Sequence, residues 1–557
     1  MPVAALAGLA ALTAVAAASF WSARRTRAQL EKRLRGEWGH PRDRRRDMAA
    51  VADWFEQIDP GRCALDDRAA GDLLIDEVFA WLDRTQSRVG EQVLYSRLRS
   101  KRRALDAFEA LVDRVGGDSS VRERTQLALS RLQDPSAYYL HRLARPDAVA
   151  RRPWDVLVPI WTGAIVALSV LSIVWPPLLV VVALSLLVNV LVRIITGHRV
   201  AGQIASFRQL GPLLSAARDL RSLGSPETAS ILGTLRDDLA ALRRIGAVAR
   251  WVSRDPSTTP DVLFLTLEYL NLLLLMDVNA LFFAAGELRT RGPALLRAIE
   301  AVGEVDAAVA VASVRAGATR WTRPTFIADD EPAVFADVCH PLIAEPVPNS
   351  IELGPPYGVI VTGSNMSGKS TFLRTVGINI VLAQSVHTCL ATRYRAPFYE
   401  VRTCIGRADD LAGGTSYYQA EVDTVVSLLR ASERRTPQFF IIDELFRGTN
   451  AVERIAAGAA VLSALVEADA PHVALLATHD AELVDLLRDT YLAYHLADAL
   501  EPDGLTFEFR LTPGPATSRD AIALLRLGGA PGRVIDRALA QAAALDRRRA
   551  RLAAETG

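Results

Sequence analysis

The distribution of apolar residues along the chain divides it into three kinds of segment. Residues 3–22 and 156–192 are long uncharged runs. Residues from about 50 to 150 and from 200 to 325 carry apolar residues three and four positions apart, which predicts amphipathic helices. From about 331, short runs such as "YGVIVTG", "QFFIIDE" and "HVALLATHD" alternate with helical stretches. This last pattern predicts a parallel sheet covered by helices.

The first uncharged run, "VAALAGLAALTAVAAASFWS", has about the ~20 residues that span a bilayer. Three arginines follow it directly, Arg24, Arg25 and Arg27, whereas a secretory signal carries its positive charge in front. We therefore expect residues 1–23 to be a retained membrane anchor. A cleaved signal and a peripheral helix are the alternatives.

The second run, "VLVPIWTGAIVALSVLSIVWPPLLVVVALSLLVNVLV", is interrupted near its middle by Trp175-Pro176-Pro177. Its length and the arginines on both sides predict a transmembrane helical hairpin over residues 156–195, with a buried helix pair as the alternative. Together the two runs predict a multi-pass protein of the inner (plasma) membrane, with the remaining chain in the cytoplasm. A third apolar stretch, residues 264–288, contains Glu268 and Asp277 and is therefore expected to be a buried helix.

Composition adds little to this picture. The 557 residues carry a formal net charge of +1, so a basic surface can only be local. Residues 24–49 are such a basic segment, and anionic lipid is a better expected partner for it than DNA. The four cysteines have no CxxC spacing, which argues against a disulfide framework or a zinc site.

The predicted domains follow in order along the chain. They are an anchor at 1–23, a basic juxtamembrane linker at 24–49, a helical core in two parts at 50–155 and 196–330, the hairpin at 156–195, an α/β domain at 331–540 and a helical tail at 541–557. The predicted fold class is therefore α/β, in which a domain with a parallel sheet follows an all-α region that the hairpin interrupts.

A phosphate-binding loop is the strongest chemical signal. The loop "GSNMSGKS", from Gly363 to Ser370, fits the pattern G-x-x-x-x-G-K-[ST], and it lies between the strand-like "GVIV" and a helical stretch. Glycines let backbone N–H groups face phosphate oxygens, a lysine reaches the outer phosphates, and a serine hydroxyl can bind Mg²⁺. The predicted nucleotide ligands are Gly363, Ser364, Asn365, Met366, Ser367, Gly368, Lys369, Ser370 and Thr371.

Two further strand ends carry residues suited to ATP hydrolysis. The run "FFII" ends in Asp443 and Glu444, where the first carboxylate can hold Mg²⁺ together with Ser370 and the second can activate the attacking water. The run "HVALLATHD" places His479 where an imidazole could sense the γ-phosphate. ATP and Mg²⁺ are the predicted cofactors, with Glu444 and His479 as the catalytic residues. The α/β domain at 331–540 is therefore predicted to be a P-loop ATPase domain.

Four segments, "TGSNMSGKSTFLR", "DDLAGGTSYYQAEV", "IIDELFRGTN" and "LATHDAELV", occur in an order that closely resembles the ATPase domain of the MutS family of DNA mismatch-repair proteins, a branch of the ABC-type ATPases. The resemblance implies that Ser416 contacts the nucleotide of a partner subunit. It also implies that active sites form only in a dimer, expected to be a homodimer, and that Arg447 to Asn450 run along the dimer interface.

The resemblance also extends to parts of the helical region, such as "LDRTQSRVGEQVLYSRLRS" and "AIEAVGEVDAAVAVASV". In other respects the chain departs from the family. Members that read mismatches carry an N-terminal domain with a Phe-x-Glu wedge, and no such domain is recognised here. The letters "FYE" at Phe398 to Glu400 lie inside the ATPase region. Neither a DNA clamp nor a long C-terminal extension is found, and no motif identifies a MutL-like or nuclease partner.

The expected function is that of a membrane-anchored MutS-type ATPase whose dimer acts on mismatched or branched double-stranded DNA. Two alternatives have no DNA role: a nucleotide-gated membrane scaffold and a transport-type ABC ATPase. Against transport, the hairpin has few polar residues, and "DDLAGGTS" differs from the LSGGQ motif of transporters.

Overall fold

The chain folds into two compact units in a computed structural model. One consists of residues 1–63 and 79–319 and is called the helical unit here, and the other consists of residues 64–78 and 320–557 and is called the sheet unit. The structure describes residues 21–22, 24–58, 64–100, 104–145, 157–252, 269–271, 274–364, 366–405, 417–446, 449–468, 470–501, 504–516, 522, 525–526 and 528–556.

The helical unit is built around one long helix, α15 (Met276–Gly317). It packs against α5 (Arg88–Arg99), α6 (Leu105–Gly117) and the 3₁₀ segment η3 (Pro135–Ala144), and its face from Val302 to Val314 is buried. Further helices of this unit include α2 (Met48–Ile58), α7 (Ser119–Leu129), α10 (Leu210–Leu220), α11 (Ala229–Leu232), α12 (Leu235–Ala241) and α13 (Arg243–Val252), while α4 (Ile75–Leu82) begins in the sheet unit and ends in the helical unit. The helix-rich region expected from the apolar periodicity is confirmed.

The basic segment at 24–49 forms ion pairs within the helical unit. Arg46 contacts the carboxylate of Asp83 at 2.8 Å, and Arg44 contacts both Asp83 and Glu91. The two acidic side chains are completely buried. A buried carboxylate needs such partners, so packing within this unit explains these two arginines.

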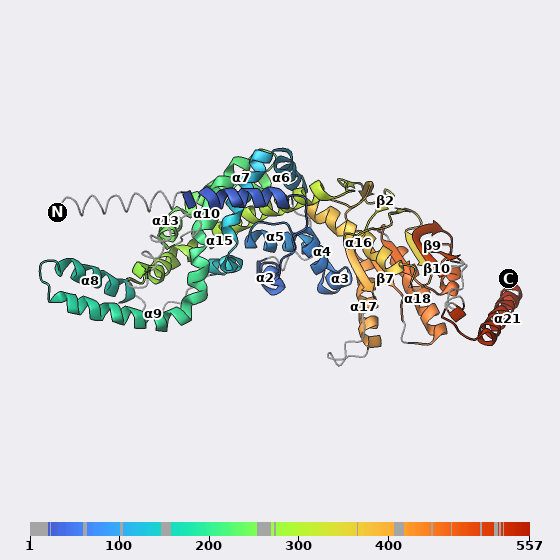
Figure 1. Ribbon diagram of the computed structural model, residues 1–557. Helices are drawn as coiled ribbons and strands as arrows, with labels where there is room; N and C mark the ends of the chain where they lie inside the picture. The colour runs from blue at the N-terminus through green and yellow to red at the C-terminus, as the bar shows by residue number, and fades with distance from the viewer. Residues whose placement is uncertain are drawn as a thin grey trace. The chain divides into compact units, whose positions relative to one another are not determined.

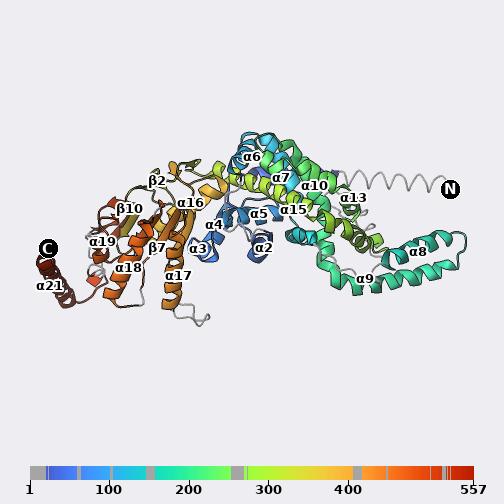
Figure 2. The same cartoon turned by 180° about the vertical axis from the view of Figure 1, so that it is seen from behind.

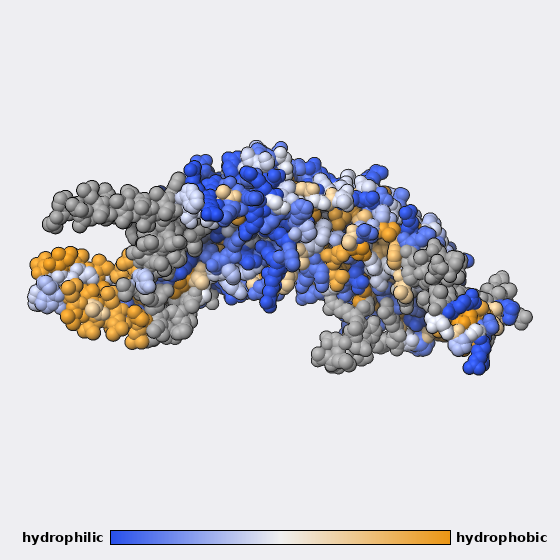
Figure 3. All heavy atoms as spheres, in the orientation of Figure 1, coloured by the Kyte–Doolittle hydropathy of each residue, from blue (hydrophilic) through white to orange (hydrophobic). Residues whose placement is uncertain are grey.

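Helices α8 (Leu157–Leu171) and α9 (Leu178–Arg208) lie side by side as a hairpin in both ribbon views (Figures 1 and 2). The indole Nε1 of Trp161 on α8 donates to Asn189 Oδ1 on α9 at 2.9 Å. The surface of the hairpin is largely apolar (Figure 3), and Ile173 and Val174 near its turn are about 80% exposed. The sequence thus correctly predicted two helices joined at Trp175-Pro176-Pro177.

The interpretation of this hairpin as membrane-spanning is wrong. Across the ranges described above, no helix combines the length and the apolarity that a membrane span requires. The predicted multi-pass location in the inner membrane is therefore incorrect. Most of the predicted anchor, residues 1–20 and 23, lies outside the described residues.

The sheet unit contains two sheets, as the alternation of short apolar runs and helices predicts. The larger has the strand order β10-β9-β4-β8-β7-β6 and is parallel except for the β9–β10 pair. Its strands are β4 (Gly358–Thr362), β6 (Glu400–Ile405), β7 (Gln438–Asp443), β8 (Val473–Ala477), β9 (Tyr491–Glu501) and β10 (Gly504–Pro513). The smaller sheet has the order β1-β5-β2-β3 and consists of β1 (Thr325–Phe326), β2 (Ala333–Val338), β3 (Asn349–Leu353) and β5 (Arg393–Ala396).

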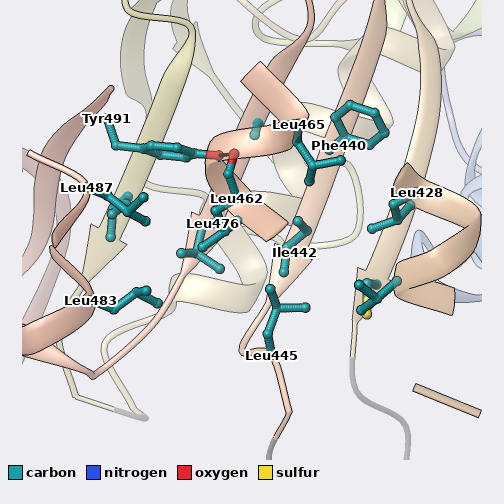
Figure 4. Close-up of a cluster of buried hydrophobic side chains, with 14 of the residues drawn as sticks. Leu428, Phe440, Ile442, Leu445, Leu462, Leu465, Leu476, Leu483, Leu487 and Tyr491 are labelled. Atoms are coloured by element: carbon teal, nitrogen blue, oxygen red, sulfur yellow. Dashed lines mark hydrogen bonds between the residues drawn. The ribbon is translucent and has the colours of Figure 1, made fainter. Parts of the chain in front are cut away.

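Helices around the larger sheet include α16 (Lys369–Val386), α17 (Tyr417–Ser432), α18 (Ala451–Val466) and α19 (Ala481–Leu486), and the chain continues to the C-terminal helix α21 (Gly532–Thr556). Figure 4 shows a hydrophobic core in which Leu428 of α17 and Leu462 of α18 cover Ile442 of β7. The Tyr491 hydroxyl donates to the carbonyl of Leu462 at 2.8 Å and satisfies the one polar group that its ring brings into this core. The predicted α/β architecture with parallel strands is confirmed.

A short segment from early in the chain also belongs to the sheet unit. Helix α3 (Asp67–Asp72) lies against the edge strand β6. The carboxylate of Asp72 accepts the hydroxyl of Thr403 at 2.7 Å and the backbone N–H of Ile405 at 3.3 Å. Nothing in the apolar periodicity predicted this contact.

Candidate nucleotide site

The predicted phosphate-binding loop lies between the strand β4 and the helix α16, as the sequence pattern indicates. All five residues of β4 are buried, so the strand fixes where the loop begins. The loop bends at Gly363 and Gly368, whose φ values of +133° and +91° suit only glycine. A Cβ atom at Gly363 would lie 2.8 Å from Ser367 Oγ. The two glycines therefore permit the tight turn that brings the loop onto the start of α16.

Lys369, the first residue of α16, is almost completely buried. Its Nζ donates to the carbonyl oxygens of Gly363 and Ser364, each at 2.7 Å. The lysine is thus held within its own loop, beside the N-terminal N–H groups of an 18-residue helix. A cation beside the N-terminal N–H groups of a helix forms a site suited to an anion such as phosphate.

The other predicted loop ligands are placed in different ways. Ser367 Oγ donates to the Ser364 carbonyl at 2.9 Å, while the Oγ of Ser364 is itself buried without a partner in the described part of the chain. Met366 is 61% exposed, and Thr371 is partly buried in the first turn of α16. Asn365 lies outside the described residues.

Ser370 and Asp443 meet at the predicted metal position. The Ser370 hydroxyl donates to Asp443 Oδ2 at 2.5 Å, although the two residues are 73 positions apart. The pairing of β4 and β7 with β8 explains this meeting, because parallel strands that share a neighbour end at the same sheet edge. A hydroxyl and a carboxylate are oxygen donors of the type that Mg²⁺ prefers, so these residues fit that ion.

Glu444 and His479 also meet at this edge. His479 Nδ1 lies 2.8 Å from Glu444 Oε1. The hydrogen bond to Glu444 raises the pKa of His479 above its ordinary value of 6.5, against the opposing effect of partial burial. The backbone N–H of Glu444 donates to the carbonyl of Ala477 at 3.0 Å, which ties the end of β7 to the end of β8.

Two contacts that sequence reasoning missed support these residues. Arg454 on α18 forms two hydrogen bonds with Asp480, at 3.1 and 2.8 Å, next to His479. Glu421 on α17 accepts the backbone N–H of Phe446 at 2.5 Å, two residues after Glu444. Glu421 precedes the buried Val425 and Leu428 by four and seven positions. An acid on an apolar helix face is the signal that could have identified it.

Several residues to which the family resemblance assigns a role lie outside the described residues. Ser416 belongs to the segment 406–416, which lies outside the described residues, and so do Arg447 and Gly448. Asn450 is described and caps α18 by accepting the N–H of Glu453 at 3.0 Å. The assignment of Ser416 to a partner's nucleotide stays a prediction.

Comparison with known proteins agrees with this geometry. Residues 359–546 match the family described as MutS domain V, and this range includes the loop, both carboxylates and His479. The chain is 34% identical over 267 residues to the DNA mismatch repair protein MutS of Thermus caldophilus, a match that covers 47% of this chain and 31% of the relative.

Two more relatives show the same pattern. The MutS of Roseiflexus sp. (strain RS-1) is 35% identical over 281 residues, a match that covers 48% of this chain and 25% of the relative. The MutS of Natronomonas pharaonis is 34% identical over 247 residues, a match that covers 43% of this chain and 28% of the relative. The chain thus matches about a third or less of the length of these relatives. The similarity to the family described as MutS domain V is thus confined to residues 359–546, and the similarity to MutS proteins extends over nearly half of the chain.

Proposed function

We propose that this protein is a MutS-type ATPase that converts ATP and water to ADP and phosphate with Mg²⁺. One observation carries the proposal: three neighbouring parallel strands bring the Lys369 loop, the Ser370–Asp443 pair and the Glu444–His479 pair to one sheet edge. A phosphate cradle, a metal position and a candidate base at one edge are the parts that phosphoryl transfer to water requires.

Binding would use groups that the loop already orients. Lys369 would exchange its two carbonyl contacts for phosphate oxygens, and the N–H groups at the start of α16 would donate to the same oxygens. Ser370 and Asp443 would hold Mg²⁺, which neutralises charge on the phosphates when bound.

Hydrolysis requires a group that accepts a proton from the attacking water. Glu444 fits this role because its carboxylate follows the metal position directly and is oriented by His479. As a water oxygen forms its bond to the γ-phosphorus and the bond to ADP breaks, Glu444 takes the water proton. His479 holds Oε1 of Glu444 and thereby restricts the direction of the carboxylate.

We further propose that the working form is a homodimer, in which Ser416 of one subunit completes the site of the other, and that the partner is mismatched or branched double-stranded DNA. Support comes from the resemblance of "DDLAGGTSYYQAEV" and from relatives named as DNA mismatch repair proteins. The alternative functions of transporter and membrane scaffold lack a membrane span in the described part of the chain.

The ATPase proposal is tested by measuring ATP binding and turnover of the purified full chain. Lys369→Ala is expected to weaken ATP binding, whereas Glu444→Gln should keep binding and reduce turnover by about 100-fold or more, because general-base catalysis contributes roughly 10²–10⁴-fold. Wild-type turnover no greater than that of Glu444→Gln would reject the proposal. Light scattering of Glu444→Gln with ATP then tests whether ATP holds a dimer.

The DNA proposal needs a separate measurement. Turnover is compared without DNA and with homoduplex, heteroduplex and branched DNA, and binding is measured at low salt, where phosphate contacts are strongest. A change in turnover with one DNA structure, absent in Lys369→Ala, is the expected result. Indifference to every DNA, together with no binding, would remove DNA as the partner and leave the ATPase proposal intact.

A further inference from the structure

Glu421 is a buried acid that the proposed mechanism does not use. It lies on α17 and is 7% exposed, and its Oε1 accepts the backbone N–H of Phe446 at 2.5 Å. The two residues are 25 positions apart. The hydrogen bond therefore connects α17 with the turn that follows β7 and carries Glu444.

The backbone of this turn has a conformation that needs support. Glu444 and Phe446 have φ values of +58° and +57°, in the left-handed region that residues other than glycine rarely adopt. Such a conformation persists where surrounding contacts determine it. Two backbone donors of the turn are held from outside, the Glu444 N–H by the carbonyl of Ala477 and the Phe446 N–H by Glu421.

The chemistry of Glu421 is unusual for its position. Val425 and Leu428, one and two helical turns further along the same face, are buried in the hydrophobic core that also contains Leu445 of the turn (Figure 4). An apolar residue would fit the pattern of this face. Burial of a carboxylate is unfavourable unless it is hydrogen-bonded, and the Phe446 N–H provides such a bond.

We propose that Glu421 is a positioning residue for Glu444. By accepting the Phe446 N–H it holds the left-handed turn, and the turn directs the Glu444 carboxylate toward His479 and the attacking water. The part of this inference that concerns water rests on the proposed ATPase function. The part that concerns the turn does not.

Three variants separate positioning from general packing. Glu421→Leu places an apolar side chain of similar size in the core that cannot accept the Phe446 N–H, whereas Glu421→Gln keeps an acceptor oxygen. Asp423→Leu changes an exposed acid two residues away on the same helix and serves as the control. Thermal unfolding confirms that each variant is folded.

We expect Glu421→Leu to lower kcat about tenfold or more, with the KM for ATP changed less than about threefold, because the binding loop is not part of this contact. Glu421→Gln should recover most of the lost kcat, and Asp423→Leu should behave as wild type. A Glu421→Leu protein with wild-type kcat would overturn the proposal.

A double variant tests whether Glu421 acts through Glu444. In a Glu444→Gln background, Glu421→Leu should lower kcat less than about threefold, because the Glu444 carboxylate that Glu421 orients is already absent. An undiminished effect in that background would show that Glu421 acts elsewhere.

Amide hydrogen exchange in the absence of nucleotide provides a readout independent of turnover. The peptide containing Leu445 and Phe446 should exchange faster in Glu421→Leu than in wild type or Asp423→Leu. Unchanged exchange would refute the positioning role even in an active ATPase. Absence of wild-type turnover would reject the proposed function, while faster exchange would still support the role of Glu421 in the turn.

Discussion

The imidazole Nδ1 of His479 lies 2.8 Å from the carboxylate Oε1 of Glu444, and the pair joins the ends of two adjacent parallel strands. Because the hydrogen bond to Glu444 raises the pKa of His479 above 6.5, the imidazolium form persists to a higher pH in the folded protein. The pairing therefore stabilises the fold fully below the unfolded pKa, and this contribution is lost as pH rises through the raised folded value.

NMR titration of His479 is expected to give a pKa above 6.5, and Glu444→Gln should bring it back toward that value. His472 provides an internal control, because burial lowers its pKa below 6.5. If the titration of His479 is the same in wild type and Glu444→Gln, the two side chains are not paired in solution.

Gly368→Ala is expected to weaken ATP binding about tenfold or more, since a left-handed residue other than glycine costs on the order of 1–3 kcal/mol. The φ of Gly368 is +91°, and an added Cβ would lie 3.0 Å from Cδ1 of Phe509. Gly532→Ala is the matched control, because its added Cβ meets no atom within 4 Å and its φ is not in the left-handed range. Equal affinity of both variants for ATP, measured by calorimetry, would contradict the prediction.

Asp72→Ala should destabilise the sheet unit by about 1–3 kcal/mol, because it leaves the Thr403 hydroxyl and the Ile405 N–H without their buried acceptor. Denaturant unfolding of Asp72→Ala, Thr403→Val and the double variant measures this contact. The double variant should be less destabilised than the sum of the single variants. Strict additivity would show that the two side chains do not interact.

Asp306 predicts a pH-dependent stability in the helical unit. Its carboxylate accepts the N–H groups of Gln86 and Ser87, at 2.8 and 2.7 Å, and the Ser87 hydroxyl at 2.5 Å. Burial is the main cause that raises the pKa of Asp306 to about 7. The folded state therefore binds more protons than the unfolded state between about pH 4 and 7, and stability falls as pH rises through that range.

Asp306→Asn removes this titration while it keeps an acceptor oxygen. Between pH 4 and 8 the free energy of unfolding of the wild type should fall by on the order of a few kcal/mol relative to that of Asp306→Asn, because each unit of pKa shift corresponds to ~1.4 kcal/mol. Thermal unfolding across this pH range measures the difference. A difference that does not change with pH would contradict the raised pKa.

The sequence predicted the parts of the site that depend on local pattern. The strand "GVIV", the glycine loop and the helix after it are one continuous segment, and a β-strand that ends in Asp443 could be read from its own residues. Parallel pairing then explains why Ser370 and Asp443 meet. The sequence alone was therefore sufficient to select the candidate residues Lys369, Ser370, Asp443, Glu444 and His479.

Contacts between segments that are distant in the sequence could not be predicted from the sequence pattern. Glu421 had no assigned role because its partner is a backbone N–H, which every residue except proline carries. The left-handed φ at Glu444 also follows from tertiary contacts rather than from residue type. For the apolar hairpin the sequence pattern was misleading instead. Its composition suggested a bilayer, whereas no helix in the described residues is long and apolar enough to cross one.

The place of α3 in the sheet unit has a practical consequence for dissection of the protein. The chain enters the sheet unit at residue 64, leaves it at 78 and returns at 320, so no single cut releases a complete unit. A fragment that begins at residue 320 would lack Asp72 and leave the outer edge of β6 without α3, and exposed strand edges promote aggregation. Supplying residues 64–78 through a short linker, as a circular permutation, would restore that edge and make the isolated sheet unit suitable for expression.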